Sequence, residues 1–273
     1  MKRNELDNYK SKIIDLYINR NIPCSKIASE MNCSLCGIYD ALKRWGIKTR
    51  NLSESHKVYS LNENYFEKID NEEKAYWLGF IYADGYITGS KLGISLAKCD
   101  IDHLEKFLKC IESDCKIKTY KSKSIYGECE YCRVLLNSNK LVNDLKNKGV
   151  INNKSLKLTF PKENIIDISL YRHFIRGYFD GDGSLVLSKN SINFKFCGTK
   201  EFLEGLLDIF NKVIYDYTYK KKLFKRHIDN KNNYYISYGG RIKTFKIMDY
   251  MYNNCTIYLN RKYNKYIDLK STF

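Results

Sequence analysis

Two aspartates end similar stretches of sequence that lie 98 residues apart. The first stretch reads WLGFIYADG and contains Asp84; the second reads IRGYFDGDG and contains Asp182. Each has the pattern of an apolar helix that ends at its aspartate, where the carboxylate lies beside the negative end of the helix dipole. A cation is therefore expected near each carboxylate, and the matched positions predict a pseudo-twofold site in which two carboxylates converge on metal.

The chemistry of such a site follows from its oxygen ligands. Two neighbouring carboxylates repel, which favours protonation of one unless divalent cations neutralise them. Oxygen-only ligands suit Mg²⁺, with Mn²⁺ as a substitute, because Mg²⁺ keeps most of its waters and takes phosphate oxygens as further ligands. Such ions polarise a phosphodiester, activate water and stabilise the leaving oxygen. A lone Asp before Gly is more often a cap or turn residue, but the matched pair favours the metal site.

Small residues recur four apart in both stretches, at Gly79 and Ala83 and again at Gly177 and Gly181. Glycine inside a helix costs about 1 kcal/mol relative to alanine, so a compensating contact is expected. Small residues at this spacing let two helices cross closely. We therefore predict a helix–helix interface through these four residues that brings the two aspartates together.

The end of each predicted helix is marked by a glycine directly after the aspartate. Gly85 and Gly183 fit the left-handed conformation that commonly ends a helix.

The segments around these helices repeat the order α-β-β-α-β-β-α, so the fold class is α+β with two pseudo-symmetric halves. After the first acidic helix we expect strands at 86–88 and 92–98, a helix at 101–111, strands at 116–123 and 130–136, and a helix at 139–148. The second half repeats this order with strands at 184–188 and 192–197, a helix at 201–214, strands at 217–227 and 234–238, and a helix at 242–252.

Alternation within the strands separates two faces. Apolar residues on one face can be covered by helices; they are Leu92, Ile94, Leu96, Leu185, Leu187, Ile192, Phe194 and Phe196. Their neighbours form a basic, hydroxyl-rich face. On a chain of this charge that face predicts contacts with phosphates and base edges in a DNA groove, although a solvated sheet face is the alternative. The predicted contacts are Tyr86, Thr88, Ser95, Lys116, Lys118, Tyr120, Ser184, Ser188, Asn193 and Lys195.

Residues 9–19, 24–31 and 34–45 have the pattern of three short helices in helix-turn-helix spacing, with Ser34 as a candidate N-cap. The third helix would then present its polar face to a major groove and the flanking phosphates. The predicted DNA contacts here are Ser34, Leu35, Tyr39, Lys43 and Arg44. A plain protein-contact module is the alternative. The predicted organisation is thus a helix-turn-helix module at 1–46, a basic linker at 47–64, and halves at 65–160 and 161–273.

The net charge supports a polyanionic partner. The chain has 47 Lys and Arg against 31 Asp and Glu, a formal charge of +16, so nucleic acid is the first candidate and an anionic membrane surface the second. The first ten residues lack the apolar core of a signal peptide, and the most apolar window, 75–83, is about half the length of a membrane span. We therefore expect an intracellular protein that does not enter the membrane.

Ten cysteines include two C-x-x-C pairs, Cys33 with Cys36 and Cys129 with Cys132. The pairs are too far apart in sequence for one zinc module, and residues three apart on a strand point to opposite faces. We expect free cysteines that act mainly as small core residues.

Taken together, the two acidic motifs resemble those of the LAGLIDADG homing endonucleases in their single-chain form with two motifs. The resemblance runs from about residue 65 to 273 and includes the runs KSLKL at 154–158 and LNRKY at 259–263. It implies a saddle-shaped antiparallel sheet on a long double-stranded DNA target and Mg²⁺-dependent cleavage of both strands, with Asp84 and Asp182 as the metal-binding catalytic residues. The motif's earlier acid is kept as Asp180 in the second copy and replaced by Tyr82 in the first; that position is not expected to hold metal.

Members of the family often place a basic residue beside the metal site after the fourth strand of each half. Aligning 131–133 with 234–236 puts Lys140 opposite Lys243. A lysine there could polarise water or stabilise phosphorane charge, and a solvated first-turn residue is the alternative.

Three other functions share parts of this pattern. A splicing maturase would use the same surface for structured intron RNA, and the sequence leaves this open. A non-cleaving DNA-binding regulator could lack the acids, and the best-known bacterial ones carry the helix-turn-helix after the repeats. An intein would need a Cys or Ser start and a His-Asn end, whereas this sequence starts with Met1 and ends with Phe273. A monomeric DNA endonuclease is the prediction.

Overall fold

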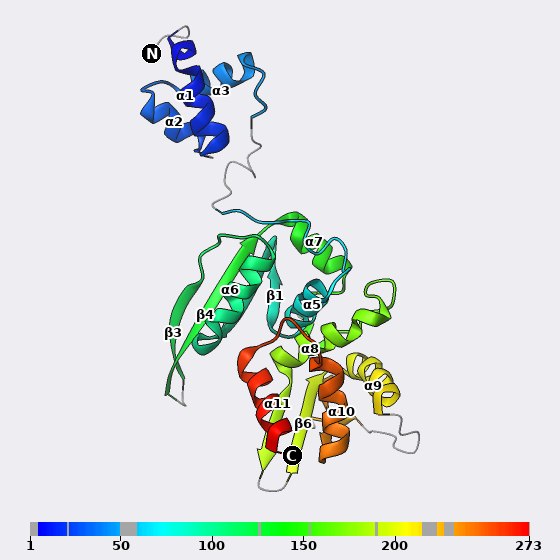
Figure 1. Cartoon of the computed structure of the whole chain (residues 1–273). Helices are drawn as coiled ribbons and strands as arrows, with labels where there is room; N and C mark the ends of the chain where they lie inside the picture. Colours follow the sequence, from blue (N-terminus) through cyan, green and yellow to red (C-terminus); the bar gives the residue numbers. More distant parts are fainter. Residues whose placement is uncertain are drawn as a thin grey trace. The chain divides into compact units, whose positions relative to one another are not determined.

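The computed structural model describes residues 5–20, 22–49, 59–124, 127–152, 154–188, 191–214, 223–226 and 232–272 (Figure 1). Contacts divide the chain into two compact units, residues 1–58 and 59–273. Each unit is described by itself below.

The first unit is a small helical domain with its own core. A continuous helical stretch runs through η1 (Leu6–Tyr9), α1 (Lys10–Ile14) and η2 (Asp15–Asn19), and is followed by α2 (Cys24–Glu30) and α3 (Leu35–Arg44). The Ser34 side chain accepts a hydrogen bond from the Gly37 amide at 3.1 Å and so caps α3. The three expected helices are confirmed, and their apolar faces meet in a core that includes Ile13, Ile27, Ile38, Ala41 and Leu42.

The second unit contains two antiparallel sheets of four strands each. The first sheet has the order β1-β2-β4-β3, from β1 (Gly85–Thr88), β2 (Lys91–Ala97), β3 (Lys118–Ser124) and β4 (Gly127–Asn137). The second has the order β5-β6-β8-β7, from β5 (Ser184–Ser188), β6 (Ser191–Gly198), β7 (Phe224–Lys225) and β8 (Tyr234–Gly239). The predicted strand at 217–227 lies mostly outside the described residues, and Lys116 precedes β3 instead of lying in it.

The helices follow the predicted repeat. In the first half they are α5 (Glu72–Asp84), α6 (Ile101–Cys110) and α7 (Asn139–Asn147); in the second they are α8 (Tyr171–Asp182), α9 (Lys200–Ile214) and α10 (Arg241–Tyr252). Short 3-10 turns occur at η3 (Lys98–Asp100), η4 (Lys154–Leu156) and η5 (Ile168–Leu170). One helix was not predicted: α11 (Asn260–Thr272), which follows the second half. None of the helices in the described ranges is long and apolar enough to cross a membrane.

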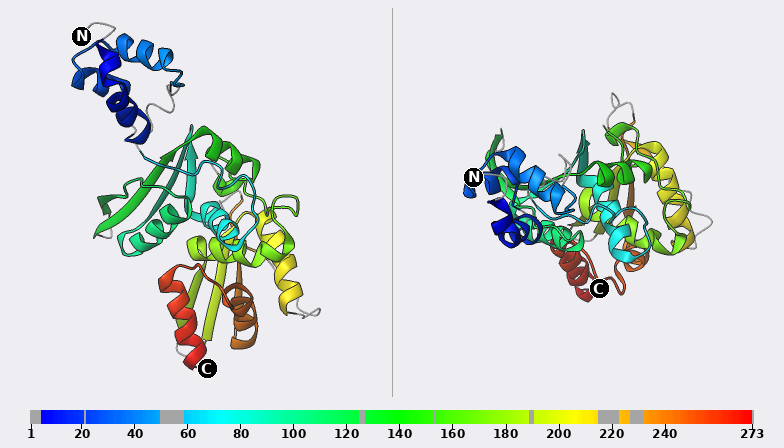
Figure 2. Two further views of the ribbon diagram at one scale, coloured as in Figure 1. Left: turned by 45° about the horizontal axis from the view of Figure 1, so that its top comes forward. Right: turned by 90° about the horizontal axis from the view of Figure 1, so that it is seen from above.

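The two faces of each sheet differ as predicted. The apolar strand residues Leu92, Ile94, Leu96, Ile192, Phe194 and Phe196 are buried, and α6 and α7 contact β2 as α9 and α10 contact β6. The opposite face, called the outer face below, carries the polar neighbours. Among the described residues of the second unit, helices thus pack against one face of each sheet (Figure 2).

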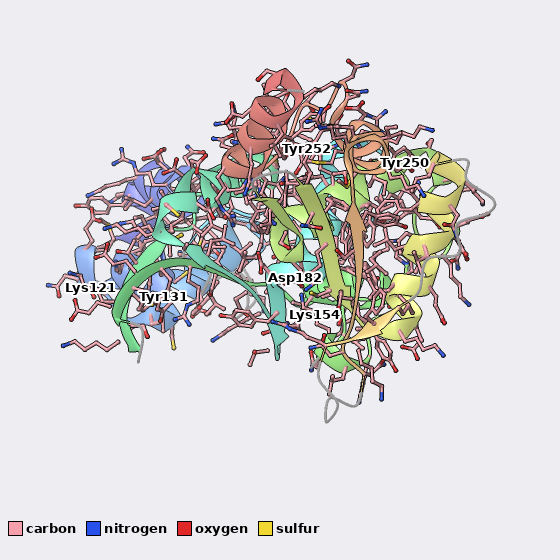
Figure 3. All side chains as sticks on the ribbon, turned by 90° about the horizontal axis from the view of Figure 1, so that it is seen from below. Lys121, Tyr131, Lys154, Asp182, Tyr250 and Tyr252 are labelled. Atoms are coloured by element: carbon pink, nitrogen blue, oxygen red, sulfur yellow. The ribbon has the colours of Figure 1, made fainter. Side chains whose placement is uncertain are left out.

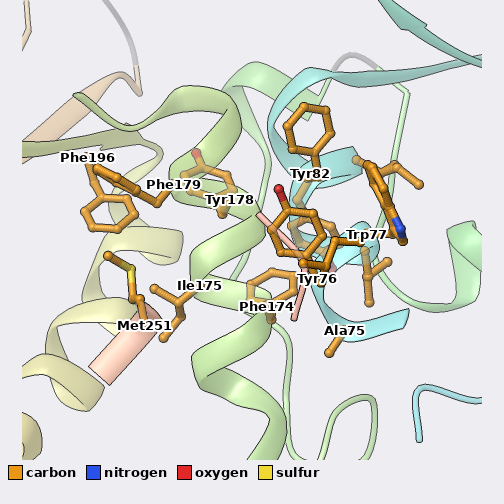
Figure 4. Packing of buried hydrophobic residues seen from close by; sticks show 14 of the residues in the cluster. Ala75, Tyr76, Trp77, Tyr82, Phe174, Ile175, Tyr178, Phe179, Phe196 and Met251 are labelled. Carbon is orange, nitrogen blue, oxygen red and sulfur yellow. The ribbon is translucent and has the colours of Figure 1, made fainter. Parts of the chain in front are cut away.

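The crossing of α5 and α8 joins the two halves (Figure 1). A Cβ atom built on Gly79 would lie 2.0 Å from the carbonyl oxygen of Phe174, and one on Gly177 would lie 1.9 Å from that of Tyr76. Any side chain at either position would force the helices apart. Figure 4 shows the rings that fill the crossing, among them Tyr82, whose ring centroid lies 5.0 Å from that of Phe174.

The glycines after the aspartates do not adopt the predicted left-handed conformation. Gly85 has φ −75° and Gly183 has φ −76°, both in the extended region. The physical reason for glycine is space: an added Cβ would lie 2.7 Å from Ile81 Cγ2 in the first half and 2.0 Å from Phe179 Cδ2 in the second.

A buried arginine strengthens the junction between the halves. Arg176 of α8 is fully buried and donates to Glu72 Oε1 of α5 at 2.7 Å. It also donates to the carbonyl oxygens of Met251 at 2.7 Å and Ile257 at 2.9 Å. Because removing one partner of such a network leaves an unpaired buried charge, these contacts hold the two central helices and the chain after α10 in one arrangement.

Candidate active site

The two aspartates lie at the adjoining ends of α5 and α8. Asp84 packs against the small residue at the end of the other helix, since a Cβ on Gly181 would lie 3.2 Å from Asp84 Oδ2. Burial and the nearby carboxylate of Asp182 raise the pKa of Asp84 to about 6. Burial also raises the pKa of Asp182. The two helices cross closely at Gly79, Gly177, Ala83 and Gly181. This crossing brings the two carboxylates near enough for the charge of Asp182 to act on Asp84.

A half-buried lysine lies against the carbonyl end of α5. The ammonium nitrogen of Lys154 donates to the carbonyl oxygens of Ile81 at 2.7 Å, Tyr82 at 2.6 Å and Ala83. An ammonium group has three N–H donors, so all of them are used by the helix end. Lys154 therefore supplies the positive charge that the C-terminus of a helix favours.

The second half repeats this arrangement with Lys262. Its ammonium nitrogen donates to the carbonyl oxygens of Phe179 at 2.5 Å, Gly181 at 3.3 Å and Gly183 at 2.6 Å. Figure 3 shows Lys154 and Asp182 next to one another in the region between the two sheets. The cation that the helix dipole requires at each aspartate is thus part of the chain itself.

The two lysines and two aspartates form one electrostatic cluster. Burial lowers the pKa of Lys154 to about 8, opposed by Asp182 and Asp84. Burial also lowers the pKa of Lys262 to about 8, opposed first by Asp180. Even with both lysines present, burial and Asp182 keep the pKa of Asp84 high. The lysines therefore do not fully neutralise the carboxylates.

The residue two positions before each aspartate fixes the chain that carries the lysine. In the second half, Asp180 is fully buried and accepts hydrogen bonds from Tyr76 Oη at 2.7 Å, Tyr252 Oη at 2.5 Å and the Leu259 amide at 2.8 Å. Leu259 lies three residues before Lys262. Both carboxylate oxygens of Asp180 thus accept hydrogen bonds from groups of the protein itself.

The first half uses a tyrosine at the same position. The Tyr82 hydroxyl donates to the Lys148 carbonyl oxygen at 2.5 Å and lies so close to Gly149 that a Cβ there would be 2.1 Å from it. Gly149 has φ +95° and begins the turn that leads to Lys154. Tyr82 and Asp180 thus both hold the chain segment that carries the lysine of their half, Tyr82 as a hydrogen-bond donor and Asp180 as an acceptor.

The lysine segment of the second half rests on the first half. Arg261 Nε donates to both carboxylate oxygens of Asp100, at 3.1 and 2.9 Å. Asn260 Nδ2 donates to Asp102 Oδ2 at 2.6 Å, and Asn260 Oδ1 accepts from Lys106 Nζ at 2.8 Å. The acceptors Asp100 and Asp102 lie at the start of α6 in the first half. The first half therefore holds Asn260 and Arg261, and through them positions Lys262.

The lysine segment of the first half rests in turn on the second half. The Thr199 hydroxyl, just before α9, donates to the Leu158 carbonyl oxygen. Asn232 Nδ2 donates to the Leu156 carbonyl oxygen at 3.0 Å, and Asn232 Oδ1 accepts from the Lys200 amide at 3.1 Å. Each lysine segment is therefore held by the corner between sheet and helix of the opposite half.

The lysines chosen from sequence, Lys140 and Lys243, lie in α7 and α10 respectively. Lys140 pairs with Asp144 at 2.6 Å and with Glu67 at 3.2 Å. It is the second residue of α7, and Ile242, not Lys243, is the second residue of α10. The sequence alignment was therefore displaced by one residue. The cations that act most strongly on both aspartates are Lys154 and Lys262.

A pocket of about 200 Å³ opens beside Asp182. Its polar lining includes Lys154, Thr199, Arg226 and Asn233. The Arg226 charge lowers the pKa of Asp182, acting against burial after the two lysines.

Two of the pocket-lining residues correspond to a different pair in the first sheet. The Arg226 amide donates to the Asn233 carbonyl oxygen at 3.0 Å, two residues beyond the Phe224–Tyr235 pair. The equivalent pair in the first sheet is Tyr120 and Tyr131, whose rings stack at 5.1 Å. Two stacked tyrosines in the first sheet therefore correspond to an arginine and an asparagine in the second.

The predicted outer-face residues lie on the side away from the helices. Strand register joins Ser95 to Arg133 and Arg133 to Lys118, and joins Ser184 to Lys195. Thr88, Lys116, Lys118 and Asn193 are exposed, while Tyr86, Ser95, Tyr120, Ser184 and Lys195 are half-buried. The Ser188 side chain lies outside the described atoms. Arg133, Tyr131, Lys91 and Tyr235 share this face and were missed, although their alternation in sequence indicates it.

On α3 of the first unit the predicted contacts divide into two groups. Leu35, Tyr39 and Lys43 are exposed. The Ser34 side chain is used as the helix cap. The Arg44 guanidinium donates to Asp7 at 2.8 Å, so it also stabilises the unit itself.

The cysteines are free, and only Cys24 and Cys132 among them are buried. The expectation of mainly core cysteines was therefore too simple. In the part of the chain that the structure describes, no group of three or more His, Cys, Asp or Glu is arranged to hold a metal ion. A cation at this site would rely on the two aspartates together with water and substrate oxygens. The donor set fits a hard divalent cation, because both ligands are oxygens whose repulsion persists beside the lysines.

Comparison with known proteins agrees with this architecture. Residues 169–247 match the sequence profile of a LAGLIDADG-like domain. The replication factor C small subunit of Methanocaldococcus jannaschii is 30% identical over 164 residues; the match covers 59% of this chain but only 8% of that protein.

Two solved structures have similar folds. The homing endonuclease I-WcaI bound to its DNA recognition sequence is 16% identical, with 71% of this chain and 88% of that chain covered and a TM-score of 0.48. The LAGLIDADG homing endonuclease I-GzeII in complex with its DNA target is 12% identical, with 74% and 89% covered and a TM-score of 0.48. The second half is thus similar to a LAGLIDADG-like domain over residues 169–247, and the first half repeats its strand order and its acidic helix end.

Proposed function

We propose that the protein is a sequence-specific DNA endonuclease that makes a metal-dependent double-strand break by hydrolysing one phosphodiester in each strand. The observation that carries this proposal is the cluster of Asp84, Asp182, Lys154 and Lys262 at the adjoining ends of two helices. A purely structural crossing would not need two mutually repelling carboxylates, since the pKa of Asp84 remains raised by burial and by Asp182.

In this proposal Asp84 and Asp182 hold the divalent cation, Mg²⁺ or Mn²⁺. When bound, the metal polarises the scissile phosphate and lowers the pKa of a ligated water. The protein supplies two carboxylates at fixed positions, and each helix end is held in place by a lysine. Water attacks phosphorus and gives up a proton to solvent, one phosphorus–oxygen ester bond breaks, and the leaving oxygen takes a proton from solvent.

Lys154 and Lys262 act as fixed positive charges in this scheme. Each has its three donors occupied by carbonyl oxygens, so neither can donate a proton to DNA without leaving its helix end. Their charge lies beside the aspartates, where a transferring phosphate gains negative charge in the transition state. Positioning such charges before the reaction avoids reorganisation during it.

The outer faces of the two sheets are the proposed surface for double-stranded DNA. They present Lys118, Arg133 and Lys195 together with hydroxyl groups, and the chain carries a net charge of +16. Cations on such a face neutralise phosphates, and side chains between them reach base edges. Two pseudo-symmetric halves in one chain suit a monomer on a long, asymmetric target.

The function is tested by selecting cleaved sites from a randomised DNA library with Mg²⁺ and the whole protein. The expected result is one long sequence cut in both strands. The same library with both aspartates replaced by asparagine should give binding without cleavage. If the double variant cuts equally well, the assignment of the two carboxylates is wrong; if wild type binds one sequence and never cuts, a non-cleaving regulator is the better description.

We also propose that the first unit extends the DNA site through α3, whose Leu35, Tyr39 and Lys43 are exposed. Removing residues 1–49 should weaken specific binding and flatten its dependence on salt, because phosphate contacts are lost. Fluorescence anisotropy across a salt series measures this slope. An unchanged slope would show that the first unit does not contact DNA.

A further inference from the structure

The outer faces of the two sheets differ in chemistry at matched positions. Thr88 and Val186 are each the fourth residue after the aspartate of their half, and both lie on outer faces. Thr88 lies opposite Lys91 on the neighbouring strand, and Val186 lies opposite Asn193. Val186 is 52% exposed. A hydroxyl-bearing residue in the first half is therefore replaced by an exposed aliphatic side chain in the second.

A second exchange occurs on the third and fourth strands of each sheet. Lys118 pairs with Arg133 in the first sheet, and Phe224 pairs with Tyr235 in the second. These pairs are equivalent because Arg133 lies opposite Ser95 in the same way that Tyr235 lies opposite Cys197. Two cations in the first half thus correspond to two aromatic rings in the second.

The contacts around these side chains fix them on their faces. Arg133 donates to Tyr120 Oη at 2.9 Å, with its guanidinium 4.6 Å from that ring. In the second sheet the rings of Phe224 and Tyr235 stack at 5.4 Å, and Lys195 Nζ lies 4.1 Å from the Tyr235 ring. Phe224 remains 45% exposed after this stacking. The second face therefore presents an ordered apolar surface beside a cation.

One matched position differs in the opposite sense. Leu135, 38% exposed, corresponds to Ser237 of the second sheet. The first face is therefore not free of apolar surface, but its single exposed leucine lies between a cation and an amide on its own strand, Arg133 and Asn137.

We propose that the two faces read different base chemistry, so that Val186 and Phe224 make the second half-site depend on the C5-methyl groups of thymine. This rests on the proposed function, since it takes the outer faces to lie in the major groove of DNA. The thymine methyl is the apolar group that a base pair presents in that groove, whereas guanine presents two acceptors that suit arginine. The first half, with Arg133 and Lys118, reads by hydrogen bonds instead.

Lys195, together with the exposed Arg226 two residues after Phe224, supports a nucleic-acid occupant for this apolar surface. An apolar protein partner would not gain from the cation that lies on Tyr235. Phosphates flanking a base step would contact these cations while the methyl groups contact Val186 and Phe224.

The test uses the whole protein and its selected target, with thymidine replaced by deoxyuridine in one half-site at a time. Deoxyuridine pairs identically but lacks the methyl group. Binding is measured by fluorescence anisotropy at fixed salt with a chelator present, so that no DNA is cut. We expect affinity to fall about fourfold for each contacted methyl that is removed in one half-site, and to change less than twofold in the other.

Two substitutions identify the responsible half. Val186→Thr with Phe224→Lys installs the residues of the first half, and should abolish the sensitivity to deoxyuridine. The matched pair Thr88→Val with Lys118→Phe should create it in the other half-site. Both positions of each pair are on outer faces, and thermal unfolding checks that the variants fold as the wild type does.

The outcomes separate this inference from the proposed function. Equal sensitivity of both half-sites, no sensitivity in either, a selected target without thymine in the sensitive region, or sensitivity unchanged by the Val186 and Phe224 substitutions would each overturn it while leaving a DNA-binding protein. Failure to select any DNA sequence would instead refute the proposed function.

Discussion

In the first half, a tyrosine hydroxyl donates to a backbone carbonyl and holds the turn before Lys154; in the second, a buried carboxylate accepts from a backbone amide and holds the turn before Lys262. The two lysines nevertheless reach their helix ends in the same way. The difference shows that the repeat preserves the position of the lysine, while the group that anchors its segment is free to change.

The carboxylates themselves are less equal than their positions. Asp84 is the less accessible of the two and packs on Gly181, whereas more of Asp182 remains accessible beside the pocket that Arg226 lines. The halves are thus symmetric in backbone and asymmetric in solvent access. The following predictions test how far the halves remain equivalent.

The largest effect is expected from the aspartates. Asp84→Asn and Asp182→Asn should each lower cleavage by about a thousandfold or more, because each removes a ligand of the proposed cation, while specific binding changes little. A nicking assay on supercoiled target DNA with each strand labelled measures this. Asp208→Asn, on the exposed side of α9, is the matched control. A variant that still cuts one strand at the wild-type rate would show two independent centres.

The lysine substitutions should rank next. Lys154→Met and Lys262→Met each remove a fixed charge beside the aspartates and should reduce cleavage about a hundredfold. The exposed Lys157→Met and Lys265→Met, three residues further along, are the controls. Single-turnover rates at saturating DNA separate the chemical step from binding. Unequal losses would mean that the two centres depend differently on their lysines.

The anchors should differ in their effect on stability. Asp180→Asn disrupts a buried carboxylate with three donors and should cost about 3 to 5 kcal/mol. Tyr82→Phe removes one hydrogen bond and should cost about 1 kcal/mol. Urea unfolding of the metal-free protein provides both numbers. Equal losses of unfolding free energy would contradict the view that Asp180 contributes more to stability than Tyr82.

The smallest effect concerns the stability of the metal-free protein. The folded-state pKa of Asp84, about 6, lies above the ordinary value of 3.8 for an aspartate. The folded protein therefore binds more protons than the unfolded chain between these values, and stability falls as pH rises from about 4 to 6. Asp84→Asn should remove this loss and raise the unfolding free energy at pH 7 by about 3 kcal/mol.

Thermal and urea unfolding at pH 4.5 and pH 7 give the comparison, with Asp208→Asn as the control. A pH profile identical in wild type and Asp84→Asn would contradict a raised pKa at this position.

Much of the fold was predictable because it depends on local patterns. Strand alternation identified Leu92, Ile94 and Phe196 as core residues, and helix periodicity with a capping serine placed α3. The close crossing at Gly79 and Gly177 followed from residue size alone. These features need only neighbours along the chain or a steric argument.

The lysines of the site could not be assigned in this way. Lys154 and Lys262 reach helix ends about 70 to 80 residues earlier in the chain, and no periodic pattern encodes such a return. A usable signal was present, because each lies in a K-x-x-K run after the closing helix of its half, at Lys154–Lys157 and Lys262–Lys265. Helix α11 was missed because its buried residues, Tyr266 and Leu269, are few within a polar stretch.

The prediction of left-handed glycines after the two aspartates was wrong for a different reason. A glycine after a helix commonly ends it by conformation, but Gly85 and Gly183 are extended and continue directly into strands. Their role is to leave room for Ile81 and Phe179, which only the folded backbone reveals.

The reciprocal docking of the two lysine segments affects how such a protein could be recombined. A chimera that joins one half to a foreign half would separate Arg261 from Asp100, or Leu158 from Thr199, even if the central crossing still formed. Successful exchange would have to carry the corner of one half along with the tail of the other. The smallest part of this chain that could be exchanged is therefore not one half alone. Exchanging halves to change the DNA target should succeed only where both contacts between the halves are transferred with them.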